Sequence, residues 1–290
     1  MLRSYRPADL SVVTKFLGDC WLRDNPNNYH PGDFVHWMSS RYRGERLEEH
    51  FFIAEEAGEV LSIVELDTAS GYYAFVMDSR RCGGQWELEF HRTCTAMMRE
   101  RQTRAVKVNL KADDAAGKAC LRKLGFKPAD ADYAVLKCVL DRVPESRLPE
   151  GFHIRPLAGP HEAQLAADVH NGAFRRNWTE VEYRKVLKTP GFEAERELVA
   201  IAPDGRFAAF AVIWPDPVSR TGLFEPVGCH REFARRGLAK ALLHAGMARM
   251  KAAGMKVALV GCEPSNKAAC ALYHSAGFEP FFDTVDYVLD

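Results

Sequence analysis

The strongest constraint on the fold is an internal repeat of one strand–helix unit. Residues 105–128 resemble residues 257–280, and both segments end in Gly-Phe-x-Pro. Phe126 and Phe278 align at an offset of 278 − 126 = 152 residues. Two tandem copies of one α/β unit are the simpler interpretation, and chance similarity between two strand–helix units is the alternative.

The chain of 290 residues is long enough for two domains of ordinary size. We expect one domain over residues 1–143 and a second over residues 151–290. The segment between them, residues 141–151, is polar and contains two prolines, which is typical of a linker.

Charge and composition exclude several classes of partner. Thirty-nine basic residues balance thirty-nine acidic ones, which gives no support for a nucleic-acid or membrane-surface partner. No apolar run is long enough to span a membrane, and the N-terminus lacks the apolar core of a signal peptide. The eight cysteines show neither a C-x-x-C pair nor a zinc spacing, so we expect no metal and reduced thiols in the cytoplasm. The oligomeric state is left open between monomer and homodimer.

A strand–turn–helix stretch over residues 223–243 is the best candidate for a binding site. An apolar strand ending near Cys229 leads through a compact turn into a helix with an apolar face, and His244 is expected on the solvent side of that helix. Such a turn leaves the first N–H groups of the helix unpaired, and the helix dipole adds positive charge there. Arg235 and Arg236 add two cations, and Gly237 leaves the access open. The pattern predicts a phosphate cradle, with an ordinary strand–turn–helix unit as the alternative.

The turn resembles the acetyl-CoA pyrophosphate loop of GNAT-type N-acetyltransferases, with the pattern Gln/Arg-x-x-Gly-x-Gly/Ala. Five of the six positions from Ala234 to Ala239 suit it, and the departure is Ala234 itself. A second string, N-x-x-A-x-x-L-Y-x-x-x-G-F, resembles the last characteristic segment of this family, and here it comprises Asn266, Ala269, Leu272, Tyr273, Gly277 and Phe278.

The resemblance implies two tandem GNAT-like acyl-CoA N-acyltransferase domains of the α/β class, each with a mixed sheet. The residue pattern of the second half predicts the order β-α-α-β-β-β-α-β-α-β, with residues 283–289 closing its sheet, and this order agrees with the fold of the family. Pro226 cannot donate to a ladder, and the resemblance implies that this strand splays from its neighbour, with an ordinary edge strand as the alternative.

The resemblance also implies acetyl-CoA as co-substrate. Asn266 would bind the cofactor arm, although an N-cap role suits it equally well. The full set of expected cofactor-binding residues is Val227, Gly228, Cys229, Arg235, Arg236, Gly237, Leu238, Ala239, Lys240 and Asn266.

Acetyl transfer to an amine needs a neutral amine, a stabilised carbonyl oxygen and a proton for the departing thiolate. By resemblance, Tyr273 is the proton donor, with a core tyrosine as the alternative. Glu225 is the candidate base, and it could equally hold a cationic substrate or face solvent. A nucleophilic cysteine is not expected, because no histidine lies near Cys229, Cys262 or Cys270 in sequence to activate it.

The two copies are not equivalent. Gly237 falls opposite Gln85 at the 152-residue offset, and Glu87 and Glu89 place negative charge where a cradle would want none. The first copy is therefore expected to be degenerate and to lack a working site.

The expected function is N-acetylation of a primary amine on an unidentified small-molecule acceptor. Phe174 and Trp178 could wall the acceptor pocket, and Arg175 or Arg176 could grip a carboxylate. Two alternatives stay open. One is a non-catalytic acetyl-CoA sensor or scaffold. In the other, the length and layout also resemble the mycothiol synthases, although no residue specifies that thiol substrate.

Overall fold

The computed structural model describes residues 2–22, 29–43 and 45–290. The chain forms two compact units, each built from segments that are distant in sequence. Unit 1 comprises Met1–Pro31, Arg46–Ala134 and Phe282–Asp290, and unit 2 comprises Gly32–Glu45 and Val135–Phe281.

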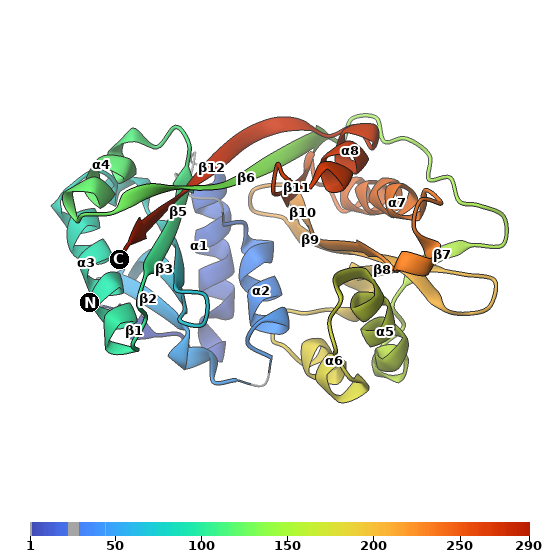
Figure 1. Cartoon of the computed structure of the whole chain (residues 1–290), viewed down its shortest axis with the longest axis horizontal. Helices are drawn as coiled ribbons and strands as arrows, with labels where there is room; N and C mark the ends of the chain where they lie inside the picture. The colour runs from blue at the N-terminus through green and yellow to red at the C-terminus, as the bar shows by residue number, and fades with distance from the viewer. Residues whose placement is uncertain (1, 23–28, 44) are drawn as a thin grey trace. The chain divides into compact units, whose positions relative to one another are not determined.

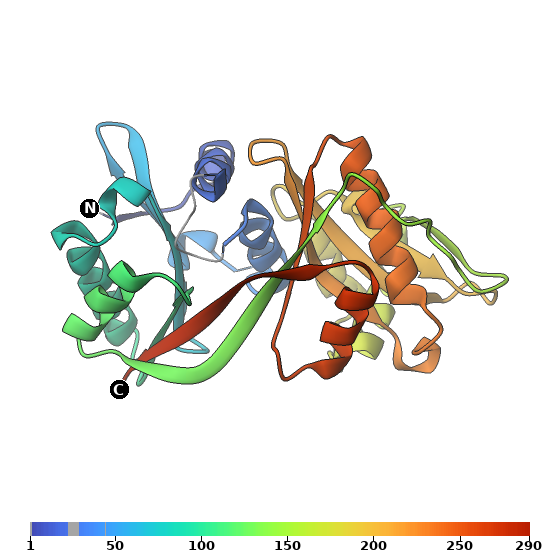
Figure 2. The same ribbon diagram turned by 90° about the horizontal axis from the view of Figure 1, so that it is seen from above.

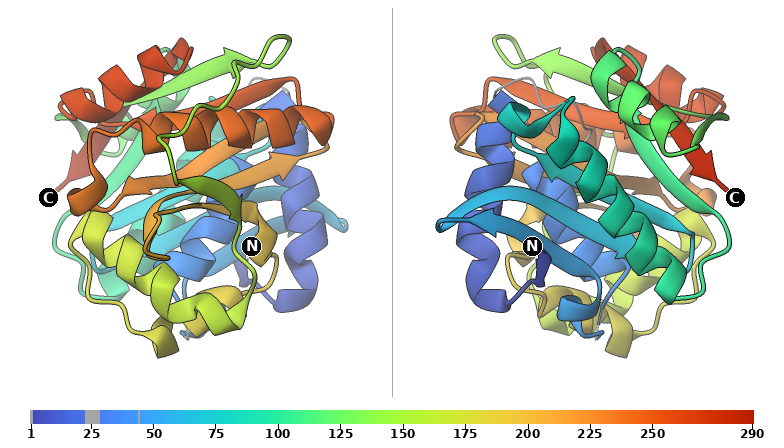
Figure 3. Two further views of the ribbon diagram at one scale, coloured as in Figure 1. Left: turned by 90° about the vertical axis from the view of Figure 1, so that its right-hand side faces the viewer. Right: turned by 90° about the vertical axis from the view of Figure 1, so that its left-hand side faces the viewer.

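Unit 1 consists of a mixed β-sheet with helices packed against it. Its strand order is β1-β2-β3-β4-β5-β12, in which β4 and β5 are parallel and the other neighbours with a defined register are antiparallel. Figure 3 (right) shows α3 lying across these strands. The elements are β1 (Leu2–Ser4), α1 (Leu10–Leu22), β2 (Phe51–Glu56), β3 (Glu59–Asp67), β4 (Tyr72–Met77), α3 (Gln85–Glu100), β5 (Val106–Lys111), α4 (Ala115–Lys123) and β12 (Glu279–Leu289).

Unit 2 repeats this plan, with the strand order β6-β11-β10-β9-β8-β7 and a parallel β10–β11 pair. In the second half of the sequence, the elements from β7 to β12 follow the predicted order, which confirms the mixed α/β class. The elements of unit 2 are α2 (Pro31–Ser40), β6 (Lys127–Val139), β7 (His153–Pro156), α5 (Ala163–Phe174), α6 (Glu180–Leu187), β8 (Glu197–Ile201), β9 (Phe207–Asp216), β10 (Thr221–Cys229), α7 (Leu238–Ala252), β11 (Val257–Cys262) and α8 (Lys267–Ser275).

The last strands of the two copies are exchanged. Strand β12 pairs antiparallel with β5 of unit 1, from Thr284↔Lys111 to Leu289↔Val106. The expectation that residues 283–289 close the second sheet is therefore wrong. Figure 2 shows β6 and β12 as two long strands whose ends belong to different units.

The exchange also makes the compact units differ from the contiguous ranges 1–143 and 151–290, which follow the repeat in the sequence. The physical reason is that an alternating apolar pattern specifies which strand face is buried. It does not specify which strand lies alongside.

Helices cover both faces of the unit 2 sheet. Gly246 of α7 lies against Ile213, since a Cβ added there would come 3.1 Å from the Ile213 side chain. On β9, the Phe210 ring instead stacks on His170 of α5 at a centroid distance of 3.7 Å. Because residues three apart on a strand point to opposite faces, α5 and α7 lie on opposite sides of the sheet, as Figure 1 shows.

The repeat is structural as well as sequential. Asp114 caps α4 by accepting from the Gly117 N–H at 2.9 Å, and Asn266 caps α8 by accepting from the Ala269 N–H at 3.1 Å. These caps occupy equivalent positions at the 152-residue offset (266 − 114). The second segment therefore repeats the capped strand–helix unit of the first.

The exchanged strand yields a test of the fold. Tyr287 of β12 is 1% exposed within the core of unit 1, so Tyr287→Ala is expected to lower the free energy of unfolding of unit 1. The expected loss is about 3 kcal/mol, measured by urea unfolding, because a large aromatic cavity is created.

Phe281→Ala is the matched control, because Phe281 lies on the same strand and is 46% exposed. It is expected to cost less than about 1 kcal/mol. Equal losses for the two variants would contradict the assignment of β12 to the core of unit 1.

Candidate active site

Strand β10 separates from β11 halfway along its length. The β10–β11 register runs from Thr221↔Val257 to Phe224↔Val260, whereas the register with β9 continues to Cys229↔Ala209. The register with β9 shifts between Phe224 and Val227, on either side of Pro226. The expected splay is therefore confirmed. An edge strand is excluded, because β10 lies between β9 and β11.

Two contacts hold the splayed segment in place. The indole N–H of Trp214 donates to the Glu225 carbonyl oxygen at 2.6 Å. A Cβ at Gly228 would come 2.5 Å from the Phe210 ring, so only glycine lets β10 lie this close to that ring. Within the described residues, the backbone groups of Val227, Gly228 and Cys229 that face away from β9 have no register with β11, which leaves them available to a ligand.

The turn before α7, where the sequence predicts an anion cradle, leaves its backbone exposed. Arg235 has φ 63° and Gly237 has φ 79°, and both are exposed. Helix α7 begins at Leu238, so the N–H groups of Leu238, Ala239 and Lys240 have no carbonyl partner within the helix. The first turn of α7 carries no acidic residue. A Cβ at Gly237 would meet nothing within 4 Å.

These features fit the diphosphate of acetyl-CoA. Oriented N–H groups, a helix dipole and nearby arginines favour an anion. The open space at Gly237 gives the anion access.

Tyr273 and Asn266 lie on α8. Tyr273 is 7% exposed, and burial, with the charge of Glu225 as the next cause, raises the pKa of its hydroxyl well above its ordinary value. The hydroxyl therefore stays protonated at neutral pH, as a proton donor must. Asn266 uses its Oδ1 atom as the helix cap, which leaves its amide N–H groups as donors.

Glu225 lies on β10 immediately before Pro226. Its side chain is 22% exposed, and its Oε1 atom is 3.6 Å from His36 Nε2. Burial raises the pKa of Glu225 to about 7, although the positive charge of Arg176 acts in the opposite direction. The carboxyl group is therefore poised to exchange a proton near neutral pH.

His36 is a site residue that sequence reasoning missed. It belongs to α2, in the first half of the sequence, yet residues Gly32–Glu45 are part of unit 2. Burial lowers the pKa of His36 to about 3, so the ring is neutral. Its distance from Glu225 in the sequence, 225 − 36 = 189 residues, left no spacing signal that could have revealed it.

An aromatic and cationic group lies near Glu225. The guanidinium carbon of Arg176 lies 4.6 Å from the Trp178 ring centroid and 5.1 Å from that of Phe174. Arg43, also absent from the sequence expectations, lies 4.6 Å from the same Trp178 ring. Trp178 is buried and Phe174 is 40% exposed, whereas Arg175 points to solvent at the end of α5.

The cysteines are poorly suited to be nucleophiles. Burial raises the pKa of Cys229 to about 11 and that of Cys262 to about 12. Both groups are therefore thiols at neutral pH, whereas the thiolate is the nucleophilic form.

The expectation that His244 is solvated is wrong. His244 is 7% exposed, and its Nδ1 atom lies 3.3 Å from the Glu145 carbonyl oxygen. The physical reason is that the inter-repeat segment packs on α7, where Ser146 Oγ donates to the Ala241 carbonyl at 2.8 Å.

The corresponding turn of unit 1 is closed by its own side chain. Gly83, at the position equivalent to Arg235, has φ 74°, and its N–H donates to the Glu87 carboxylate. Burial raises the pKa of Glu87, but His91, whose Nε2 atom lies 3.4 Å from Oε1, and the hydrogen bond from the Gly83 N–H outweigh it and lower the pKa, so the group is ionised. A buried carboxylate thus occupies the start of α3, where an anion would bind.

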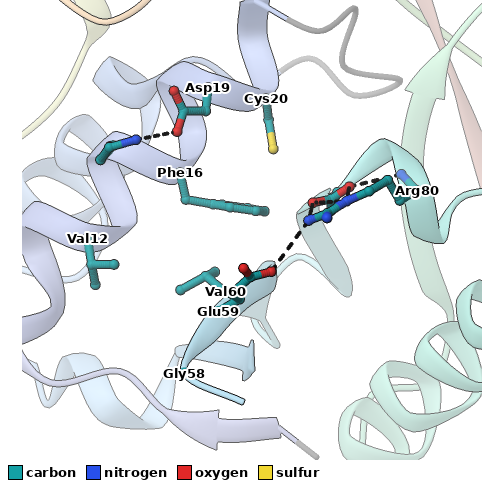
Figure 4. Close-up of a pocket in the computed structure, with 10 residues that line it drawn as sticks. Val12, Phe16, Asp19, Cys20, Gly58, Glu59, Val60 and Arg80 are labelled. Carbon is teal, nitrogen blue, oxygen red and sulfur yellow. Dashed lines mark hydrogen bonds and ion pairs between the residues drawn. The ribbon is translucent and has the colours of Figure 1, made fainter. Parts of the chain in front are cut away.

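Unit 1 also contains a cavity of about 400 Å³ between α1 and the β2–β3 hairpin, lined by Val12, Phe16, Cys20 and Val60 among others (Figure 4). Its charged groups pair with one another. Lys15 lies 2.6 Å from Asp19, and Arg80 lies 2.6 Å from Asp78 and 3.6 Å from Glu59. Each charged group of the lining thus lies within ion-pair distance of an opposite charge.

Comparison with known proteins identifies the second half of the chain. Residues 164–278 match the family model described as Acetyltransferase (GNAT) family. The C-terminal part of the chain is a GNAT acetyltransferase domain. The match spans the cradle, the splayed strand and α8, and it supports the expected enzyme class, an acyltransferase.

The curated relatives are distant. A mycothiol acetyltransferase of Nocardia farcinica is 26% identical over 263 residues, which cover 84% of this chain and 84% of that protein. A mycothiol acetyltransferase of Salinispora arenicola is 27% identical over 173 residues, and the match spans 57% of this chain but only 56% of that protein.

Solved structures share the whole fold. A GCN5-related N-acetyltransferase from Sphaerobacter thermophilus has a TM-score of 0.67 and 18% identity, covering 100% of this chain and 95% of that one. A tandem GNAT protein from the clavulanic acid biosynthesis pathway has a TM-score of 0.65 and 15% identity, covering 100% and 98%. These likenesses confirm the tandem GNAT fold. Separately, none of the helices within the described ranges has the length and apolar character needed to cross a membrane.

The raised pKa of Glu225 predicts a stability effect. A carboxyl group whose pKa rises on folding destabilises the folded state when ionised, and the loss develops as pH rises from its unfolded value through about 7. Glu225→Gln is therefore expected to raise the free energy of unfolding by about 2 kcal/mol near pH 8 and by much less near pH 5. Urea unfolding at both pH values measures this difference. A variant that loses stability near pH 8 would contradict the proposed environment of Glu225.

Proposed function

We propose that unit 2 transfers an acetyl group from acetyl-CoA to the primary amine of a small-molecule acceptor. The observation that carries this proposal is the arrangement of β10. A carboxyl group with a pKa near 7 lies directly before a splayed backbone segment, and that segment leads into an anion cradle.

The chain offers a continuous set of contacts for acetyl-CoA. Arg235, Arg236 and the first N–H groups of α7, from Leu238 to Lys240, would hold the diphosphate. The backbone of Val227–Cys229 would hydrogen-bond the pantetheine arm, and the Asn266 amide would add a donor to it. Bound acetyl-CoA supplies the thioester carbon at which the C–N bond forms as the C–S bond breaks.

Glu225 and Tyr273 would move the protons of this reaction. Glu225, ionised above its pKa of about 7, would accept a proton from the amine, directly or through water. Tyr273, held protonated by burial, would give its proton to the departing thiolate. A backbone N–H near Val227 would stabilise the charge that develops on the carbonyl oxygen. The high pKa of Cys229 favours direct transfer over an acyl-cysteine.

Unit 1 is proposed to bind no acetyl-CoA. The Glu87 carboxylate already accepts the Gly83 N–H and would repel a diphosphate. The role left to the first half of the chain includes supplying α2, and with it His36, to unit 2.

The proposal allows more than one class of acceptor. The names of the curated relatives make a mycothiol-type acceptor the second candidate. A non-catalytic acetyl-CoA sensor is the outcome if the cofactor binds and no amine is acetylated. We further propose a cytoplasmic monomer or homodimer, in keeping with cysteines that are thiols rather than disulfides.

The pH dependence of kcat/KM tests the proposed base. With an α-amine acceptor, the wild type is expected to lose activity as pH falls through about 7, because Glu225 becomes protonated. Glu225→Gln is expected to lower kcat/KM by about 100-fold and to leave only the titration of the amine, near pH 8. CoA release and acetyl-amine formation are measured together.

Tyr273→Phe is the companion variant, since it keeps the ring and removes only the proton donor. It is expected to lower kcat by about 100-fold without moving the pH midpoint near 7. An unchanged pH profile in Glu225→Gln would exclude Glu225 as the base. Absence of acetylation across a broad panel of amines would overturn the transferase proposal.

A further inference from the structure

We propose that the acceptor carries a carboxylate as well as its amine, and that Arg176 binds this carboxylate while the amine lies at Glu225. This inference rests on the proposed function and names the substrate class of the same site: amino acids and related amino carboxylates.

The environment of Arg176 calls for an anion. Its Nη1 atom is buried and has no hydrogen-bond partner among the residues that the structure describes. The guanidinium is held by aromatic rings, 4.6 Å from the Trp178 centroid and 5.1 Å from that of Phe174. These rings position the group, but they provide no oxygen or nitrogen acceptor for the buried N–H. Leaving a buried cationic donor unsatisfied is costly, and an incoming carboxylate would remove that cost.

A second cation adds positive charge beside Arg176 and so favours the binding of an anion. Arg43 lies 4.6 Å from the same Trp178 ring. It has acceptors of its own, because Nη1 donates to the Ser40 carbonyl at 2.6 Å and Nη2 contacts Glu182 at 3.4 Å. Arg43 therefore repels Arg176 without sharing a ligand with it. Burial, followed by the charge of Arg43, lowers the pKa of Arg176.

Glu225 does not neutralise Arg176 directly. The two groups influence each other electrostatically, yet they form no ion pair among the described residues. Glu225 Oε1 instead lies 3.6 Å from Nε2 of His36, whose ring is neutral. A negative and a positive group that influence each other without forming an ion pair are complementary to a zwitterion. An ammonium group fits beside Glu225, and a carboxylate fits beside Arg176.

The geometry of arginine suits this role better than that of lysine. A guanidinium offers parallel N–H donors that match both oxygens of a carboxylate, and stacking on Trp178 restricts its rotation. The chemistry remains that of the proposed function: the amine nitrogen forms the new bond, and the carboxylate only orients the acceptor.

The test compares amino acids with their carboxamides, which keep the amine and lose the negative charge. The purified full chain is expected to acetylate the preferred amino acid with a kcat/KM at least about tenfold above that of its amide. Arg176→Gln is expected to lower kcat/KM for the amino acid by about 10- to 100-fold and to leave the amide almost unchanged.

Arg175→Gln is the matched control, since Arg175 is the exposed neighbour of Arg176 and undergoes the same chemical change. It is expected to behave as the wild type with both acceptors. Calorimetric titration with acetyl-CoA confirms that Arg176→Gln is folded, and a second variant, Arg176→Lys, is expected to recover part of the activity toward the amino acid.

The outcomes separate this inference from the proposed function. Equal losses toward amino acid and amide in a variant that still binds acetyl-CoA would assign Arg176 a purely structural role and overturn the inference. Efficient acetylation of neutral amines, such as glucosamine, with no preference for carboxylates would also overturn it and would leave the transferase function intact. Acetyl-CoA binding without acetylation of any amine would refute the proposed function and the inference with it.

Discussion

The separation of β10 from β11 after Phe224 is the feature on which the site depends. A continuous ladder would pair the backbone of Val227–Cys229 and leave nothing for a ligand. Pro226, which has no N–H, stands where the register changes, and Trp214 fixes the carbonyl of the preceding residue. The same local change places Glu225 beside His36 and directs the chain toward the start of α7. Backbone geometry and acid–base chemistry therefore have a single structural origin.

Exchange of segments makes each unit dependent on both halves of the sequence. Unit 1 receives its last strand from the C-terminus, and unit 2 receives residues Gly32–Glu45 from the first half. Because Gly32–Glu45 belong to unit 2, His36 contacts Glu225 and Arg43 contacts Trp178. A first copy whose own cradle is filled by Glu87 is thereby still required for the site of the second. Packing and exchanged segments use different residues from the turn that Glu87 fills in unit 1.

The sequence was most informative where local spacing determines structure. The cradle from Ala234 to Ala239, the Asn266 cap and the order of elements all follow from turns, caps and apolar periodicity, which are local properties. Partners distant in the chain could not be predicted in this way. The pairing of β12 with β5, the contact of His36 with Glu225 and the burial of His244 under residues near Glu145 each join segments that no short-range pattern relates. The protonation state of Glu225 could not be predicted from the sequence either, because its pKa depends on burial and on the charge of Arg176.

Amide hydrogen exchange with and without acetyl-CoA tests the central claim most directly, namely that one site combines the splayed strand with the start of α7. The account predicts new protection at Leu238–Lys240 and at those amides of Val227–Cys229 that face away from β9, because these groups gain hydrogen-bond partners only when the cofactor is bound. The amides at the start of α3, where Glu87 fills the turn, are expected to be unchanged. Protection at the start of α3, or none along β10, would contradict the account.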